Sequence, residues 1–347
     1  MNSKKLRILG GMFGLEDFAA IPKQKLPWFL QKKPFFLANA RSGIFILVDQ
    51  LKPRRIWMPS YLCGAMISAV KKLKTAVHFF EMDSLLRVSS SDSLSRIRKG
   101  DLVVLIDYFG FPYDISFARK AKRRGAWILE DASQALLNAG PSLYADFVIL
   151  SPRKWIPVPD GGLLIAKHPG KLRLDLFPAP QKWQAQSFQA ALGRRDFDHG
   201  SHSREWFRLF QDCDRNAPAG PFTMSALSRM LMTQAIDYSA AAQKRRRNYH
   251  FLLRHLKPWA LLGPLRPGMT PLGFPVRLKN RDQVRKNLFR QEIYPPVHWD
   301  LKGVVPKRFS ESHRLSKEIM TLPCDQRYNL KDMKRLAGAF LKASPKR

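Results

Sequence analysis

The first half of the chain alternates short apolar runs with segments whose apolar residues recur at helical spacing. The apolar runs, which are partly β-branched, predict strands, and the periodic segments predict helices between them. The predicted strands cover residues 55–58, 77–80, 102–106, 126–130, 147–150 and 163–166. The predicted helices cover residues 42–51, 62–73 and 114–124. This alternation predicts an α/β fold whose large domain contains a mostly parallel sheet with helical crossovers.

The alternation fades beyond residue 171. Residues 200–221 are mostly polar, with glycine and proline near their end, and predict a loop that we interpret as a lid or a dimer arm. Residues 225–256 predict one long helix. Residues 272–276 and 294–299, with a closing helix at 330–341, indicate a small α+β domain. We therefore predict a large α/β domain over residues 1–245 and a small C-terminal domain over residues 246–347.

The composition is typical of a globular protein in a reducing compartment. The chain has 347 residues, of which 45% are hydrophobic and 25% charged. Its three cysteines are widely separated, which argues against a disulfide framework or a zinc site. The N-terminus begins like a signal peptide, but Glu16 and Asp17 interrupt its apolar stretch, and no run approaches the ~20 apolar residues of a membrane helix. We expect a soluble, cytoplasmic protein.

The net charge of +33 changes the range of possible partners. Basic residues cluster at 71–74, 119–124 and 244–247, which are spread over the chain instead of forming a tail. Such a surface attracts anions, including nucleotides, nucleic acid and acidic lipid headgroups, so a peripheral attraction to membranes is one interpretation. The alternative is a solvated basic face with no dedicated partner. No recognisable nucleic-acid motif accompanies the clusters, so we expect no specific nucleic-acid binding.

One lysine stands between two of the predicted strands. Lys154 follows strand 147–150 and precedes strand 163–166, and the interval holds three prolines and two glycines, which fit poorly inside strands or helices. A stiff turn therefore holds Lys154 just past the carboxyl end of a strand, the edge of an open α/β sheet where ligands bind. The alternative is that Lys154 is one of the many surface lysines of a lysine-rich chain.

Two further polar features fall on the same predicted edge. Asp131 follows strand 126–130, and Ser42 with Gly43 opens helix 42–51, whose N-terminal N–H groups can bind a phosphate. A lysine that forms a Schiff base, an aspartate that keeps a pyridine nitrogen protonated and a phosphate-binding helix together meet the needs of pyridoxal 5'-phosphate (PLP). Taken singly, the aspartate also fits a helix cap and the Ser–Gly pair also fits a turn.

These residues lie in segments that resemble the DegT/StrS family of PLP-dependent sugar aminotransferases. The resemblance spans most of the chain, is strongest over residues 38–166 and is weakest over residues 171–222. It implies the architecture of PLP-dependent transferases of fold type I. The segments that carry it are NARSG (39–43), PSY (59–61), VHFFEMD (77–83), EDASQA (130–135), RKWIPVPDGG (153–162), RRNY (246–249), YPPVHW (294–299) and LPCDQRY (322–328).

The resemblance implies roles for individual residues. Lys154 would be the catalytic lysine that binds the cofactor covalently, and Asp131 would be the catalytic partner of its pyridine nitrogen. Gln134 would lie beside the cofactor ring, near the phenolic oxygen. These assignments follow from the resemblance of residues 130–135 and 153–162 to the family's motifs.

The phosphate and ring-stacking positions depart from the family's pattern. Ser42, the Gly43 amide and Ser151 would hold the phosphate, although Ser151 precedes the lysine by a shorter interval than in most of the family. The position of the aromatic residue that usually stacks on the ring falls at Cys63, so Tyr61 or another aromatic residue must take its place. These departures leave the cofactor in place.

The implied activity is transfer of an amino group, from glutamate, to a keto group of a nucleotide-linked sugar in the biosynthesis of cell-surface polysaccharides or related molecules. The resemblance also implies a homodimer. Asp107 stands where the family often has histidine, which leaves the acceptor open. Arg153 or Arg327 could bind a substrate anion, or either could form a surface salt bridge. Dehydration or decarboxylation on the same cofactor is a rival reaction, but dehydratase relatives lack the lysine.

Two alternatives to this interpretation remain. Residues 196–202 hold two aspartates and two histidines at a spacing that could bind a metal, but their glycine- and serine-containing context favours a solvated turn. We predict no metal. The rival function is that of a non-catalytic protein that keeps the fold and binds nucleic acid or a membrane through its basic surface.

Overall fold

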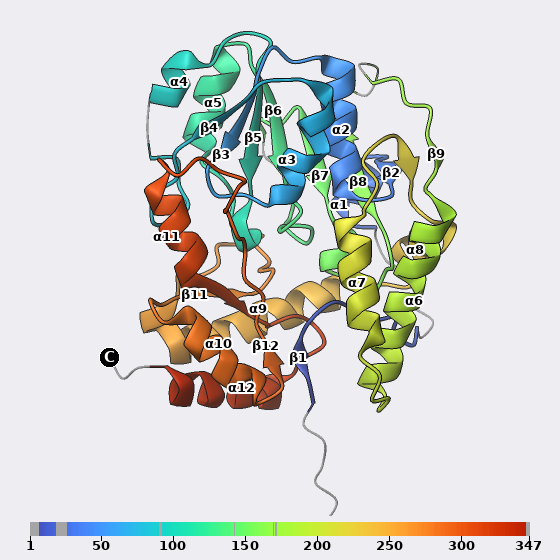
Figure 1. Ribbon diagram of the computed structural model, residues 1–347, viewed down its shortest axis with the longest axis vertical. Coiled ribbons are helices and arrows are strands. Elements are labelled where there is room, and N and C mark those ends of the chain that lie inside the picture. Colours follow the sequence, from blue (N-terminus) through green and yellow to red (C-terminus); the bar gives the residue numbers. More distant parts are fainter. Residues whose placement is uncertain are drawn as a thin grey trace, which may run out of the picture.

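A nine-stranded sheet forms the centre of the large domain in the computed structural model, which describes residues 7–18, 26–89, 92–141, 143–168, 170 and 172–344. Its strand order is β4-β3-β5-β6-β7-β8-β2-β10-β9 (Figure 1). In chain order the strands are β2 (Phe35–Leu37), β3 (Ile56–Pro59), β4 (Val77–Phe80), β5 (Leu102–Ile106), β6 (Trp127–Asp131), β7 (Phe147–Leu150), β8 (Gly162–Ala166), β9 (Phe177–Pro178) and β10 (Phe222–Thr223).

The strand directions bring the carboxyl ends of β2, β6 and β7 to one edge. Strands β3 to β7 are mutually parallel, which confirms the predicted mostly parallel α/β sheet. Strand β8 is antiparallel to β7, and β2 is antiparallel to β8, so β2 runs in the same direction as β7. Helix α2 (Ala40–Leu51) follows β2 and therefore begins at that edge.

Alternate side chains of the sheet enter two separate apolar cores. Phe147 and Ile149 of β7 pack with α2, α3 (Gly64–Val70) and α5 (Ile115–Arg123), whereas Val148 and Leu150 pack with α1 (Trp28–Gln31), α8 (Ala226–Gln234) and the start of α9 (Tyr238–Leu256). A strand places successive side chains on opposite faces, so a continuous apolar run such as FVIL fits a strand that helices cover on both faces. Most predicted elements of the first half are confirmed within one or two residues.

A third apolar core lies in the C-terminal part of the chain. It contains buried residues from the second half of α9 and from later elements, together with Leu9 of the N-terminal strand β1 (Leu9–Gly10), which pairs with β12 (Ile293–Tyr294). The other elements of this part are α10 (Arg281–Phe289), α11 (Ser310–Glu318), α12 (Leu330–Ala343) and the antiparallel pair of β11 (Phe274–Arg277) and β13 (Ile319–Leu322). The domain boundary predicted at residues 245/246 falls inside α9 and stays a prediction. The outer ends of the two predicted domains, residues 1–6 and 345–347, lie outside the described residues.

The prediction of a loop over residues 200–221 is wrong for half of that segment. Helix α7 (Glu205–Arg215) lies there, and it packs as a hairpin against α6 (Gln181–Asp198), which the sequence analysis did not predict (Figure 1). Trp206 and Cys213 of α7 are buried, and Phe210 lies on the same face. The polar residues between them face solvent, so the segment's overall polarity masked an amphipathic helix.

Two other predicted elements differ from the structure. The helix predicted over residues 225–256 is two helices, because residues 235–237 break it and Asp237 caps α9 by accepting from Ala240 N at 2.8 Å. Of the segment 294–299, only Tyr294 belongs to a strand. Within the described part of the chain, no helix has the length and apolar character needed to cross a membrane.

Candidate active site

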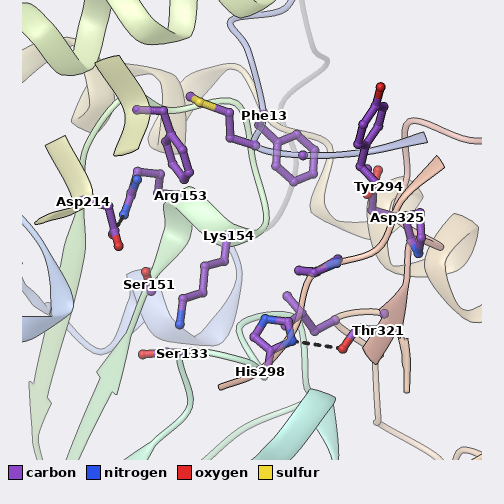
Figure 2. A pocket seen from close by; sticks show the side chains of 18 of the residues that line it. Phe13, Ser133, Ser151, Arg153, Lys154, Asp214, Tyr294, His298, Thr321 and Asp325 are labelled. Carbon is purple, nitrogen blue, oxygen red and sulfur yellow. Dashed lines mark hydrogen bonds and ion pairs between the residues drawn. The ribbon is translucent and has the colours of Figure 1, made fainter. Parts of the chain in front are cut away.

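Lys154 ends a 3-10 turn (Pro152–Lys154) that follows β7, and its side chain extends into a cavity (Figure 2). The next residue fixes this turn. Trp155 is fully buried, its indole donates to Ser133 O at 3.0 Å, and its carbonyl accepts from Gln326 Nε2 at 2.6 Å. Arg245, whose pKa burial lowers to about 10, donates to the same carbonyl and stacks on the Trp155 ring. Lys154 is therefore held on a rigid base while its amine remains accessible.

The cavity has a volume of about 760 Å³ and lies between the sheet edge and the C-terminal part of the chain. Of the residues that the sequence predicts as site residues, Asp131, Ser151 and Lys154 line it. Asp131 is the last residue of β6, is 7% exposed and accepts from Ser133 N at 2.9 Å. In Figure 2 the Lys154 amine points toward Ser133 and Ser151. We name this side, formed by Asp131, Ser133, Ser151 and Lys154, the sheet-edge wall.

The predicted phosphate residues of α2 lie behind this wall. Ser42 is fully buried, donates its hydroxyl to Pro218 O at 3.4 Å and does not line the cavity. A Cβ on Gly43 would lie 2.9 Å from Ile149 Cγ2, so Gly43 faces the sheet. Helix α2 starts at Ala40, earlier than predicted, and Asn39 caps the Ser42 N–H. The backbone N–H groups left without an intrahelical partner are those of Ala40 and Arg41, and both residues line the cavity.

Tyr61 and Gln134 are also buried behind the cavity surface. Tyr61 is fully buried against the rings of Tyr108 and Trp299, so Trp299, which does line the cavity, separates it from the opening. Gln134 Oε1 accepts from Phe109 N at 2.8 Å. Its Nε2 is buried and has no hydrogen-bond partner among the residues that the structure describes.

Two arginines beside Lys154 form ion pairs with one carboxylate that the sequence analysis did not identify. Arg153 Nη2 lies 2.9 Å and Arg41 Nη2 lies 3.2 Å from the same oxygen, Asp214 Oδ1 (Figure 2 shows the Arg153 pair). Burial favours protonation of Asp214, but the two guanidinium groups outweigh it and lower its pKa below the usual value. Asp214 belongs to α7, whose existence was not predicted, so no sequence signal connected it with the site.

His298 faces Lys154 from the other side of the cavity. Its Nδ1 lies 3.0 Å from Thr321 Oγ1, and its ring packs edge-on against Phe109 and Trp299 (Figure 2). Burial, together with the positive charge of Lys154, lowers the pKa of His298 to about 3. The imidazole is therefore neutral near pH 7 and can accept or share a proton. His298 lies in the segment YPPVHW, but no sequence pattern indicated a role for this histidine.

Arginines that lie on aromatic rings form the far side of the cavity. Arg285 lies 4.6 Å from the Phe289 ring centroid, and Arg204 lies 5.9 Å from that of Tyr294. Arg204 also pairs with Glu292 at 3.7 Å, whereas Arg285 forms no ion pair with a carboxylate in the described part of the chain. We name the residues Arg204, Arg285, Phe289 and Tyr294 the arginine wall.

The remaining residues singled out by the sequence have structural partners. Arg327 pairs with Asp325 at 2.9 Å and also donates to the carbonyls of Gly11 and Met12, so it fastens the N-terminal segment beside the cavity. Asp107 is buried and accepts from Tyr113 N at 3.0 Å, and burial, with Glu130 nearby, raises its pKa well above the usual value. Neither residue presents a charge that is free for a ligand.

The donors around the cavity fit PLP. An accessible lysine amine, a carboxylate at the end of β6 and cationic groups beside Ser151 match the reactive carbon, ring nitrogen and phosphate of that cofactor. No group of three or more metal-ligating side chains occurs among the described residues. Asp198, in the segment 196–202, pairs with Arg194 at 2.9 Å.

Solved structures share this architecture over most of their length. The sugar aminotransferase Spr1654 from Streptococcus pneumoniae, described as putative and in its PLP form, aligns with a TM-score of 0.67 and 12% identity over 97% of this chain and 100% of its own. DesV from S. venezuelae aligns with a TM-score of 0.65 and 16% identity over 90% and 85%. DesI, solved in the presence of its TDP-sugar product, aligns with a TM-score of 0.65 and 18% identity over 89% and 80%.

These similarities establish the fold. Neither a family model nor a curated protein matches the sequence. The predicted fold type I architecture and its similarity to DegT/StrS-type structures are nevertheless confirmed, because aminotransferase structures of that type cover nearly the whole chain. At identities below 20% the alignments do not carry the activity over to this protein. The function therefore depends on the site.

Proposed function

We propose that the protein is a PLP-dependent aminotransferase that transfers an amino group, from glutamate, to a keto group of a nucleotide-linked sugar. The observation that carries the proposal is the accessible Lys154 amine in one cavity wall with the Asp131 carboxylate. The two side chains come from neighbouring strands β7 and β6, whose carboxyl ends meet at one edge. That edge is where open α/β sheets bind their ligands.

Residues of the sheet-edge wall and residues near it have separate tasks. When bound, PLP supplies an electron sink that stabilises negative charge on a substrate carbon. Asp131 would hold a proton on the pyridine nitrogen, and Gln134 Nε2 would donate to the phenolic oxygen. Lys154 Nζ would bind the cofactor and then move a proton from the α-carbon of the amino donor. His298, which burial keeps neutral, would add no second positive charge beside Lys154.

The arginine wall supports an anionic acceptor. Arg285 has no carboxylate partner among the described residues, and the Arg204 side chain is 60% exposed. A planar guanidinium binds phosphate oxygens in pairs, and an aromatic ring beneath it offers a stacking surface for a base or a sugar. A nucleoside diphosphate attached to a keto sugar offers both kinds of group, phosphate oxygens for the arginines and a base or sugar for the aromatic rings. DesI, solved in the presence of its TDP-sugar product, supports this substrate class.

The proposal also covers the setting of the reaction. We assign the enzyme to the biosynthesis of cell-surface polysaccharides or related molecules, in the cytoplasm and as a homodimer, in line with the family resemblance. The high positive charge would raise the local concentration of the anionic substrate.

A two-step spectral titration tests the proposal. Protein loaded with PLP should lose its visible absorption band when glutamate is added, and a nucleoside-diphosphate keto sugar should restore the band. Glutamate with no spectral effect would contradict the proposed donor, and a band that the sugar does not restore would contradict the proposed acceptor.

The same protein tests the rival function. If the basic surface serves nucleic acid, binding should be tight at physiological salt and indifferent to Lys154→Ala. We expect only weak, salt-sensitive binding, as for any strongly basic protein. Tight binding together with no response to PLP would favour the rival.

A further inference from the structure

The two arginines nearest Lys154 converge on one oxygen atom. Arg153 Nη2 and Arg41 Nη2 approach Asp214 Oδ1 at 2.9 and 3.2 Å. Arg153 also lies over the Phe210 ring at 5.2 Å, and Arg41 donates to the Asp214 carbonyl. The carboxylate lines the same cavity as Ser151 and Lys154 (Figure 2). An internal anion thus occupies the cationic corner of the site.

The end of α7 is docked on the beginning of α2. Besides the contacts of Arg41, Asn39 Nδ2 donates to Pro218 O at 2.8 Å and Ser42 Oγ donates to the same carbonyl at 3.4 Å. Asp214 lies in the last turn of α7, where the helix dipole disfavours a negative charge. It lies beside the positive end of α2, where a negative charge is stabilised. The contacts with α2 and Arg153 therefore explain why a carboxylate is tolerated there.

We infer that Arg41 and Arg153 form a seat for a phosphate monoester dianion, and that Asp214 is its internal counter-ion, which the phosphate displaces. The inference rests on the proposed function, because the phosphate in question is that of PLP. Neither arginine belongs to the phosphate residues that the sequence indicated, Ser42, Gly43 and Ser151. Ala40 and Arg41, in the first turn of α2, also line this side of the cavity, where the positive end of the helix dipole favours an anion.

The charges favour the exchange. Both guanidinium groups share one carboxylate oxygen, whereas a phosphate monoester offers three oxygens and nearly twice the negative charge. The Asp214 side chain is 50% exposed, so water screens its ion pairs and breaking them costs little. Once displaced, the carboxylate can turn toward solvent. Binding of phosphate should then loosen the contact between the end of α7 and α2.

Binding of inorganic phosphate to the cofactor-free protein tests the seat without relying on catalysis. By titration calorimetry, Asp214→Asn should bind phosphate about tenfold more tightly than the wild type, since it no longer competes for the arginines. Asp212→Asn, on the same helix and paired with the exposed Arg215, is the matched control and should leave the affinity unchanged. Equal or weaker phosphate binding by Asp214→Asn would overturn the inference, because Asp214 would then position the arginines.

A second pair of measurements identifies the phosphate group as the cause. Asp214→Asn should tighten the binding of PLP, followed by its visible absorption, but should leave the binding of pyridoxal, which lacks the phosphate, unchanged. Arg41→Gln should weaken phosphate binding by about tenfold, and unchanged binding would also overturn the inference. If neither protein develops a visible band with PLP, the proposed function fails, while the phosphate titration still decides the role of Asp214.

Discussion

The two walls of the cavity differ in how the chain builds them. The sheet-edge wall comes from the ends of neighbouring parallel strands and the short turns that follow them. The arginine wall comes from the start of α7 and, much later in the sequence, from α10 and β12. Its members are long side chains that rest on aromatic rings.

The difference separates two requirements of the proposed reaction. The backbone fixes the sheet-edge wall, so Asp131 and Lys154 keep their relative positions whatever substrate is bound. The arginine wall depends on side-chain packing and can change without disturbing the sheet. We therefore expect substitutions in the first wall to abolish the chemistry and substitutions in the second to alter the choice of substrate.

The largest effect is expected for Lys154→Ala. The variant should have no visible absorption band with PLP and no measurable turnover, because no other lysine among the described residues lines the cavity. Its melting temperature should stay close to that of the wild type, since the Lys154 side chain is exposed to the cavity. Lys167→Ala, an exposed lysine just after β8, is the control and should keep both band and turnover. A visible band in Lys154→Ala would contradict the assignment.

Asp131→Asn should separate cofactor binding from catalysis. The asparagine can still accept from Ser133 N, so the fold and the visible band should persist. Turnover should fall by about 10²-fold or more, because a neutral amide cannot hold the pyridine nitrogen protonated while negative charge develops. Steady-state kinetics beside the absorption spectrum check this, and full turnover would show that another residue has the role.

Arg285→Gln should affect the acceptor alone. We expect the KM for the nucleotide-linked sugar to rise about tenfold with kcat nearly unchanged, because the lost contact binds substrate and transition state alike. The half-reaction with glutamate should be unaffected. Arg290→Gln, an exposed arginine just after the same helix, is the matched control. An equal loss of rate in both half-reactions would show that Arg285 does not act on the acceptor sugar alone.

The smallest effect concerns stability and pH. His298 has a folded-state pKa of about 3, below its unfolded value of 6.5, so between these values the unfolded chain takes up a proton that the folded protein does not. Stability should therefore decrease as pH falls below about 6.5. His298→Gln should reduce the loss between pH 7 and pH 5 by about 2 kcal/mol, measured by urea unfolding. His250→Gln, on the exposed face of α9, should leave it unchanged.

The sheet-edge wall could be predicted from the sequence because its signals are local. An apolar run followed by Pro152, Lys154 and a glycine-rich turn defines both the strand and the residue beyond it. Parallel strands then bring such residues to one edge without further information. The same logic located Asp131 within one residue of the end of its strand.

The rest of the site could not be predicted because it depends on tertiary contacts. Helix α7 has a polar composition, and only its packing against α6 shows that Trp206 is buried and that Asp214 reaches the arginines. At the start of α2, the Asn39 side chain binds the Ser42 N–H, and Ala40 and Arg41 line the cavity in place of the expected pair Ser42 and Gly43. Neither effect has a signature in residue spacing.

The covalent attachment of PLP to Lys154 is the central claim, and borohydride reduction tests it most directly. Reduction of the PLP-loaded protein should fix the cofactor irreversibly, and peptide mapping by mass spectrometry should locate it on the peptide that contains Lys154. Attachment at another lysine, or no attachment after reduction, would contradict the account.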